Sequence, residues 1–300
     1  MSATARDAAY PVHVLNEHVT ALASAIDDCL KNPELKPVHR LRTGTRRIEG
    51  QLALFGAIPE FTLQKNRKRL RRVLKKIRRA AGNVRDLDVQ METIDGLRTS
   101  GAAVWKRDRT RLHDLLNEER KAAAEELNTT LGRNGKDLKQ LLKKLVKQLE
   151  PEEKLALNPQ HLAELTRVWF AGRVAVQESG TDDPDQLHAI RKAAKLARYI
   201  AENAPNSANP ARAIAERFEA VQEAGGRWHD DLILAGIARE RLGASSQLTQ
   251  ELERRCLAAL KRYQKRLHTT LGQISSAPLR LTPLPAAGVP ARRARILRRA

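Results

Sequence analysis

Apolar residues recur every three to four positions along almost the whole chain, and this periodicity constrains the fold more than any other feature. It is the spacing of amphipathic helices, and no segment shows the sustained alternation that marks a half-buried strand. We therefore predict an all-α protein. The predicted helices of the first half span Tyr10–Leu30, Val38–Phe55, Leu63–Val84, Val104–Leu131 and Leu138–Leu149, and those of the second half lie near 160–178, 185–203, 210–224, 228–242 and 247–272.

Turn and helix-stop signals separate these helices. They fall at Asn32-Pro33, Ile58-Pro59, Asp95-Gly96, Gly132 to Gly135 and Glu150-Pro151. Short connections favour antiparallel neighbours, so we predict one domain, residues 8–272, made of two helical halves, 8–150 and 158–272. Residues 273–300 are rich in Pro, Ala and Arg, which predicts a basic, disordered tail.

The positive charge of the chain is concentrated. The chain has 55 Lys and Arg against 35 Asp and Glu, a formal net charge of +20. Between Lys36 and Arg85, sixteen Lys and Arg stand against only Glu49 and Glu60, and the tail adds six Arg and no acid. A charge run is usually a solvated helix face, but no carboxylates neutralise this one. We therefore predict a polyanionic partner, bound by Coulomb attraction and counterion release.

One pattern, H-x-x-R-x-x-x-[RK], occurs twice at positions 149 residues apart. The first copy runs from His39 to Arg46 and the second from His188 to Lys195, with Arg42 and Arg191 inside them. At about 100° per residue, the three marked positions fall within about 60° of one another, so each copy forms one stripe of an imidazole and two cations. A lone helical histidine is more often structural, but the repetition makes direct ligand contact an equally good interpretation.

An acidic segment follows each stripe. Arg85-Asp86-Leu87-Asp88-Val89 follows the first, and His229-Asp230-Asp231-Leu232-Ile233 follows the second. An acid at the start of a helix caps it and offsets its dipole, and an acid beside a facing stripe orients its Arg or His. Of the two interpretations, the pattern favours capping.

The two histidine helices, the basic helix Leu70–Ala81 that runs into the first acidic segment, and the duplicated layout together resemble the CHAD family, the conserved histidine α-helical domain, over roughly residues 8 to 272. The resemblance implies two pseudo-symmetric antiparallel four-helix bundles, a basic groove or pore at their junction, and binding of inorganic polyphosphate, with a link to polyphosphate granules. The residues predicted to bind polyphosphate are His39, Arg42, Arg46, Arg47, Arg71, Arg72, Lys75, Arg78, Arg79, Arg85, His188, Arg191, Lys195 and Arg198.

The two halves differ in charge. From Leu187 to Asp231 there are seven Lys and Arg against six Asp and Glu, so the second half is almost neutral where the first is basic. We expect the first half to hold the polyanion more tightly, and the second to close the groove with its histidine stripe and Arg198, Arg212 and Arg217.

Two other functions stay open. The basic block also attracts DNA or RNA without sequence preference, and weak binding at low salt is expected. Only ten residues are aromatic, however, and none lies between Lys65 and Arg85, where a single-strand binder needs a stacking platform. The second alternative is a phosphate-chain hydrolase or its accessory subunit. Phosphoryl transfer needs clustered carboxylates for metal ions, and His229-Asp230 only superficially resembles a metal pair, so we expect no catalytic residue, metal or cofactor.

The remaining features bear on the compartment. Cys29 and Cys256 lie far apart without zinc-like spacing, so we expect core residues rather than a disulfide or a metal site. No stretch approaches the roughly 20 apolar residues of a transmembrane helix, and the start has no signal-peptide layout. We expect a cytoplasmic protein with no membrane insertion, located on polyphosphate granules if the resemblance extends that far.

Overall fold

The computed structural model describes residues 8–61, 66–97, 103–174, 183–205, 207 and 209–275. Over these residues the chain forms eight α-helices, one short 3-10 helix (Glu150–Glu152) and no β-strand, so the predicted all-α class is confirmed. None of these helices is long and apolar enough to cross a membrane. The α-helices are α1 (Pro11–Lys31), α2 (Leu35–Phe55), α3 (Arg67–Asp95), α4 (Ala103–Leu149), α5 (Pro159–Val174), α6 (Pro184–Ala201), α7 (Asn209–Leu242) and α8 (Gln247–Ser275). The predicted disordered tail lies outside the described residues, except for residues 273–275, which end α8.

Two predicted helix breaks are wrong. Helix α4 continues through Gly132–Gly135, and α7 continues through Gly225. A glycine inside a helix costs only about 1 kcal/mol relative to alanine, and close packing outweighs that cost. A Cβ atom at Gly135 would lie 3.2 Å from Ile26 of α1, and one at Gly225 would lie 2.8 Å from the ring of Tyr263 of α8. These two glycines therefore let a second helix approach instead of reversing the chain.

Helix α3 also extends past its predicted end at Val84, and runs to Asp95. The pattern of buried positions continues through the charged segment, where Asp88 takes the place of an apolar residue. Oδ1 of Asp88 accepts a 3.0 Å hydrogen bond from Nε of Arg120 on α4, which pairs the buried carboxylate with a cation. Both predicted acidic landmarks consequently lie inside helices, the first in α3 and the second in α7.

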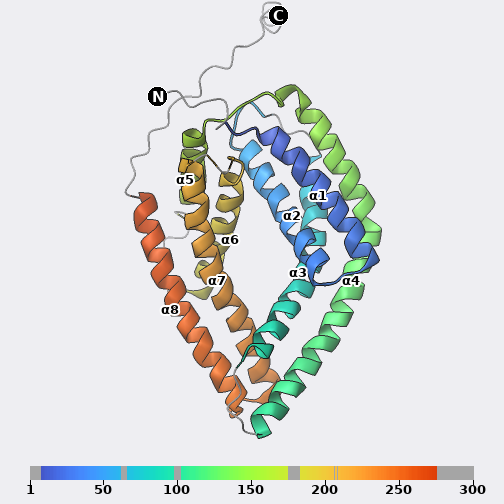
Figure 1. The fold of residues 1–300 in the computed structure, drawn as a ribbon, viewed down its shortest axis with the longest axis vertical. Coiled ribbons are helices and arrows are strands. Elements are labelled where there is room, and N and C mark those ends of the chain that lie inside the picture. The colour runs from blue at the N-terminus through green and yellow to red at the C-terminus, as the bar shows by residue number, and fades with distance from the viewer. Residues whose placement is uncertain are drawn as a thin grey trace, which may run out of the picture.

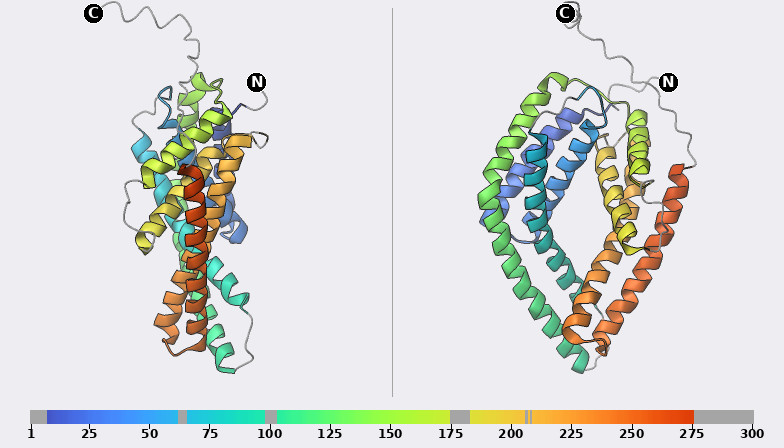
Figure 2. Two further views of the ribbon diagram at one scale, coloured as in Figure 1. Left: turned by 90° about the vertical axis from the view of Figure 1, so that its left-hand side faces the viewer. Right: turned by 180° about the vertical axis from the view of Figure 1, so that it is seen from behind.

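The eight helices form two sets of four (Figures 1 and 2). In the first set α1 contacts α2 and α4, and α3 contacts the same two helices, so the set is closed. In the second set α6 packs against α5 and α7, α5 also contacts α7, and α8 packs mainly on α7. The last helix of the first set thus contacts two helices of its set, whereas the last helix of the second set contacts mainly one. The pseudo-symmetry of the halves stays a prediction.

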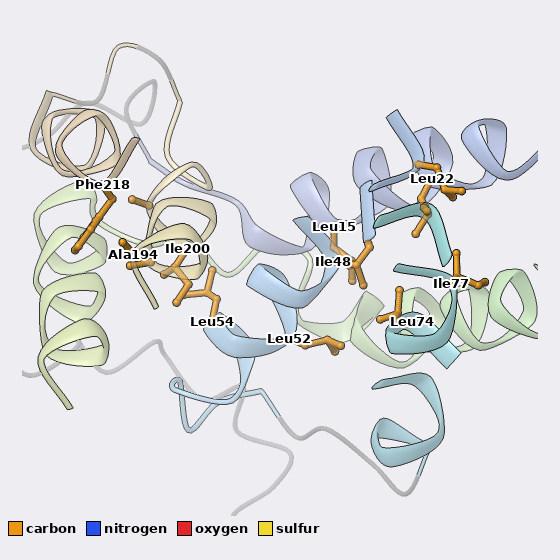
Figure 3. Packing of buried hydrophobic residues seen from close by; sticks show 14 of the residues in the cluster. Leu15, Leu22, Ile48, Leu52, Leu54, Leu74, Ile77, Ala194, Ile200 and Phe218 are labelled. Carbon is orange, nitrogen blue, oxygen red and sulfur yellow. The ribbon is translucent and has the colours of Figure 1, made fainter. Parts of the chain in front are cut away.

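The first joint between the sets is formed by α2 and α6. A Cβ atom at Gly50 would lie only 2.6 Å from Cβ of Tyr199, so the two helices approach here as closely as glycine allows. Close by, Nε2 of Gln51 donates a 2.5 Å hydrogen bond to Oδ1 of the buried Asn203. Figure 3 shows Leu54 of α2 pointing toward α6, so α2 contributes to packing on both of its sides.

The second joint lies at the other end of the molecule. The ends of α3, α4, α7 and α8 meet there, at the lower end of Figure 1. They share a small separate core made of Ile94, Leu97, Trp105, Leu112, Leu116, Leu234, Ala235, Ala238, Leu248 and Leu252. The two sets are therefore in contact at two places, the first between α2 and α6 and the second where α3, α4, α7 and α8 meet.

Candidate functional site

The first joint brings the two basic stripes together. Arg46 lies one helical turn before Gly50 on α2, and Lys195 lies one turn before Tyr199 on α6. One further turn back along each helix are Arg42 and Arg191. We call Arg42, Arg46, Arg191 and Lys195 the central cluster. All four are partly buried, and the two residues from α2 are about 150 positions away in sequence from the two residues from α6.

Burial, together with repulsion between neighbouring positive charges, lowers the pKa of three members of the central cluster, Lys195, Arg46 and Arg191. Burial, followed by the positive charges of Arg46, Arg42 and Arg191, lowers the pKa of Lys195 to about 6. Burial, Arg42 and Arg78 lower the pKa of Arg46 to about 10. The cluster therefore holds positive charge at a cost, which an anion between the two helices would remove.

Buried donors in the cluster have no acceptor within the described part of the chain. The Nε–H groups of Arg42, Arg46 and Arg191 are buried there without a hydrogen-bond partner. A buried donor without an acceptor costs about 1 to 3 kcal/mol. Oxygens of a bound anion could accept these hydrogen bonds, so the geometry and the charge favour the same kind of ligand.

The acidic landmarks orient the cluster and do not cap helices. Nη2 of Arg42 donates a 3.0 Å hydrogen bond to Oδ1 of Asp86, which lies in the middle of α3. In the second set, Asp230 of α7 is the acid that most strongly opposes the lowering of the pKa of Arg191. The capping interpretation is therefore wrong. The neighbouring acids have structural partners, Arg120 for Asp88 and Arg255 for Asp231, whose Nη2 lies 3.8 Å from Oδ1.

The two repeated histidines lie in different surroundings. The ring of His188 stacks on that of His229 of α7, with centroids 4.7 Å apart and planes inclined by 24°. Burial and the charges of Arg191 and Lys192 lower the pKa of His188 to about 4. His39 is exposed, and burial of part of its ring together with Arg85 lowers its pKa as well. Both imidazoles are therefore neutral at pH 7 in the absence of a ligand.

The basic helix α3 places its predicted residues on two stripes. Arg71, Arg78 and Arg85 repeat every seven residues on one stripe, and Arg72 and Arg79 lie about 100° further round the helix. Arg78 and Arg85 reach the neighbourhood of the cluster, since Arg78 affects the pKa of Arg46 and Arg85 that of His39.

Ion pairs distinguish the predicted cations from one another. Arg78 pairs with Glu49. Nε of Arg198 donates a 2.5 Å hydrogen bond to Glu202, and its Nη1 lies 3.0 Å from Glu219, which raises the pKa of Arg198. Arg198 is therefore largely neutralised by its own neighbours, unlike Arg191, which lies about two helical turns earlier on α6.

The other predicted residues lie at the surface. Arg47 is exposed and lines a cavity of about 310 Å³ together with His18 and His39. Arg71, Arg72, Lys75 and Arg79 are exposed on α3. Burial and the charges of Arg67 and Arg173 lower the pKa of Arg71. Their contact with a ligand stays a prediction.

Sequence reasoning missed two features of this site. His229 drew notice as part of the second acidic segment and of a metal-like pair, and its stacking on His188 is a tertiary contact that no local pattern reveals. Arg173, at the end of α5, approaches the first set although its own segment carries no basic block. No group of three or more His, Cys, Asp or Glu is placed to hold a metal ion within the described ranges. Cys29 and Cys256 are buried, as predicted, and burial raises the pKa of the Cys29 thiol to about 12.

Comparison with known proteins identifies related sequences and folds. A sequence model of the CHAD domain matches residues 13–239 of this chain. The fold is similar to the crystal structure of the CHAD domain from the plant Ricinus communis, with a TM-score of 0.61 and 19% identity, covering 93% of this chain and 96% of that one. It is also similar to PptA from Streptomyces chartreusis, with a TM-score of 0.61 and 17% identity, covering 86% of this chain and 98% of that one. A comparison with curated proteins gives no match. At these identities the structural similarity establishes the fold alone.

Proposed function

Since this chain belongs to the CHAD domain family, we propose that it binds inorganic polyphosphate non-covalently, in a basic groove at the central cluster. One observation carries the proposal. Three arginines and Lys195, from α2 and α6, converge on a partly buried site, where burial and the positive charges of the arginines lower the pKa of Lys195 to about 6. A site of this kind gains most from a ligand with a high density of negative charge. Linear polyphosphate, with about one charge per phosphate, is such a ligand.

The donors of the cluster suit phosphate oxygens. The guanidinium group of arginine donates paired hydrogen bonds to phosphate, and lysine supplies a point charge. The unpartnered Nε–H groups of Arg42, Arg46 and Arg191 are held on helices that pack tightly at the first joint. Rigid positioning reduces the entropy that is lost when the complex forms.

Nucleic acid is the weaker candidate because the aromatic rings beside the cluster are already engaged. Tyr199 and Tyr263 are both buried. The hydroxyl of Tyr263 donates a 2.8 Å hydrogen bond to the carbonyl oxygen of Leu187, and its ring stacks on Trp228. Neither tyrosine offers a free face on which a base could stack, so binding of a single strand would rest on its phosphates alone.

The proposal is binding without turnover, and association of the protein with polyphosphate granules would follow from it. The sequence supports the first part, since the basic block contains only two acids to hold the metal ions of phosphoryl transfer. Incubation of long-chain polyphosphate with the protein should release orthophosphate at the background rate. Release above background would instead favour a hydrolase.

A competition titration tests the ligand. Labelled long-chain polyphosphate is bound at about 0.15 M salt, where long-range attraction between exposed charges is largely screened. Duplex DNA, single-stranded RNA and short oligophosphate then compete at equal phosphate concentration. We expect polyphosphate to resist the nucleic acids, and short chains to compete poorly. Equal competition by DNA or RNA would make the basic block a general anion binder.

A pair of charge-matched variants tests whether polyphosphate binds at the central cluster. Arg46→Gln with Arg191→Gln removes one cation from each helix of the cluster, and should weaken binding by on the order of a hundredfold, from charged hydrogen bonds worth about 1.5 to 3 kcal/mol each. Lys143→Gln with Lys147→Gln removes two exposed cations of α4 and changes the net charge equally. Equal losses in the two variants would contradict the proposed site.

A further inference from the structure

A second basic hollow lies between α7 and α8, away from the central cluster. Its volume is about 400 Å³, and Ala220, Ala224 and Ala259 line its inner part. Small residues let two helices pack closely, so the longer side chains around them form a rim. None of the residues that line this hollow belongs to the central cluster.

The rim of the hollow carries unbalanced positive charge. Arg227 of α7 faces Arg262, Lys265 and Arg266 of α8, and Glu223 is the acid on this rim. All four cations are exposed, and across the described ranges none of them has a carboxylate oxygen within the 4.0 Å of an ion pair.

Other basic residues on the same two helices behave differently. Arg239 donates a 2.6 Å hydrogen bond to Glu253, and Arg254 pairs with Glu251 at 2.7 Å. Arg255 lies 3.8 Å from Asp231. The cations nearer the second joint thus have acids within ion-pair distance. Those around the hollow have none at that distance within the described residues, although Arg262 lies close enough to Asp231 to help lower the pKa of that carboxyl.

We propose that this hollow, the α7–α8 pocket, is a second binding site for a short run of phosphates. The inference rests on the proposed function in one respect, namely that the ligand is the same polyphosphate. Four cations against one carboxylate favour a multiply charged anion. The pocket is lined by no aromatic side chain, so it offers no stacking surface for a base.

A second site changes what the protein can select. A chain long enough to occupy both sites binds the second one intramolecularly, at a high effective concentration. At equal phosphate concentration, long polyphosphate would then bind more tightly than short oligophosphate. A short oligophosphate would fill each site separately.

Calorimetric titration of the full chain with tripolyphosphate tests the pocket by stoichiometry. We expect two sites per chain in the unmodified protein. Arg262→Glu with Arg266→Glu should lose one of them, with affinity there reduced by on the order of a hundredfold or more. Lys143→Glu with Lys147→Glu, an equally spaced pair on α4, changes the net charge equally and should keep both sites.

The outcomes separate this inference from the proposed function. If the pocket does not bind, the unmodified protein shows one site, which the Arg46→Gln, Arg191→Gln variant removes and the α8 variant keeps. If the central cluster does not bind, the single site disappears only in the α8 variant.

A measurement on the unmodified protein guards against misfolding of the variants. Acetylation of surface amines is followed by mass spectrometry at Lys265 and, as a reference, at Lys143. Tripolyphosphate should slow the modification of Lys265 by on the order of tenfold relative to Lys143, given the affinity expected from several charged hydrogen bonds. Equal rates for both lysines at saturating tripolyphosphate would overturn the proposal.

Discussion

Nη2 of Arg42 on α2 donates a 3.0 Å hydrogen bond to Oδ1 of Asp86, in the middle of α3. The pair fixes the guanidinium beside the facing stripe of α6 while its Nε–H stays buried without a partner. Because both side chains are partly exposed, the pair contributes no more than about 1 kcal/mol to folding. Its main effect is to set the direction of a cation that points toward the proposed ligand.

The different pairing of two arginines on α6 predicts different effects on binding. Arg191→Gln should weaken polyphosphate binding by on the order of tenfold, since it removes a charged group whose Nε–H has no hydrogen-bond partner within the described residues. Arg198→Gln should change the affinity by less than about threefold, because Arg198 is already paired with Glu202 and Glu219. Equilibrium dialysis measures both variants, and equal losses would mean that the site extends to Arg198.

Lys195 should take up a proton when polyphosphate binds. Its pKa of about 6 leaves it mostly neutral at pH 7.5 in the free protein, and a bound anion favours the charged form. Binding should therefore strengthen as the pH falls from 8 toward 6. Titration calorimetry at pH 7.5 in buffers of different ionisation enthalpy should report uptake of up to one proton, which Lys195→Met should abolish. Unchanged uptake in the variant would assign the proton to another group.

The same shift has a consequence for stability. The folded-state pKa of Lys195 lies below its ordinary value of 10.5, so the unfolded chain binds more protons between these two values and the burial cost falls as pH rises. Lys195→Met should therefore stabilise the protein, most below pH 6 and progressively less toward pH 10. Chemical denaturation at several pH values measures this, and a gain independent of pH would point to packing alone.

His188 should matter for binding mainly in acid. Its pKa is about 4 in the free protein, and nearby phosphate raises it. At a pH between the pKa of the free protein and that of the complex, His188 therefore takes up a proton when the ligand binds. His188→Ala should weaken polyphosphate binding more at pH 5 than at pH 8. Equal loss at both would indicate that the ring acts through its stacking on His229 and not through its charge.

Gly50 should be needed for both the fold and the site. A Cβ atom there would lie 2.6 Å from Cβ and 3.2 Å from the carbonyl carbon of Tyr199, so Gly50→Ala must separate α2 from α6. We expect a loss of about 1 to 3 kcal/mol in the free energy of unfolding, together with weaker polyphosphate binding. At Gly132 no atom lies within 4 Å of an added Cβ, so Gly132→Ala should stabilise α4 by up to about 1 kcal/mol and leave binding unchanged. Similar effects of the two changes would show that the close approach is not required.

Local patterns predicted the helices and the two basic stripes well, because periodicity and charge are local properties of a sequence. They failed where a residue's role depends on a distant partner. The sequence around Gly135 predicts a helix break, but the structure has a glycine there because Ile26 of α1 packs against it. The sequence around Asp86 predicts a helix cap, but Asp86 instead accepts a hydrogen bond from Arg42.

The composition of the site was predicted only in part for the same reason. The spacing from His39 to Arg46 places three side chains on one face, but it cannot show that Arg198 is neutralised by Glu219 of another helix. Nor can it show that His229 stacks on His188. Such facts depend on how α6 and α7 are packed, which the sequence of either helix alone does not determine.

The two joints hold the central cluster together against its own repulsion, and this places opposing demands on natural selection. Any substitution that neutralises Lys195 or Arg46 would relieve strain on the α2–α6 joint and raise the melting temperature, while removing affinity for the ligand. Adaptation to heat would therefore tend to erode this site unless the ligand itself is abundant enough to stabilise the occupied form. In a cell rich in such a ligand, selection for heat resistance and selection for binding would favour the same residues.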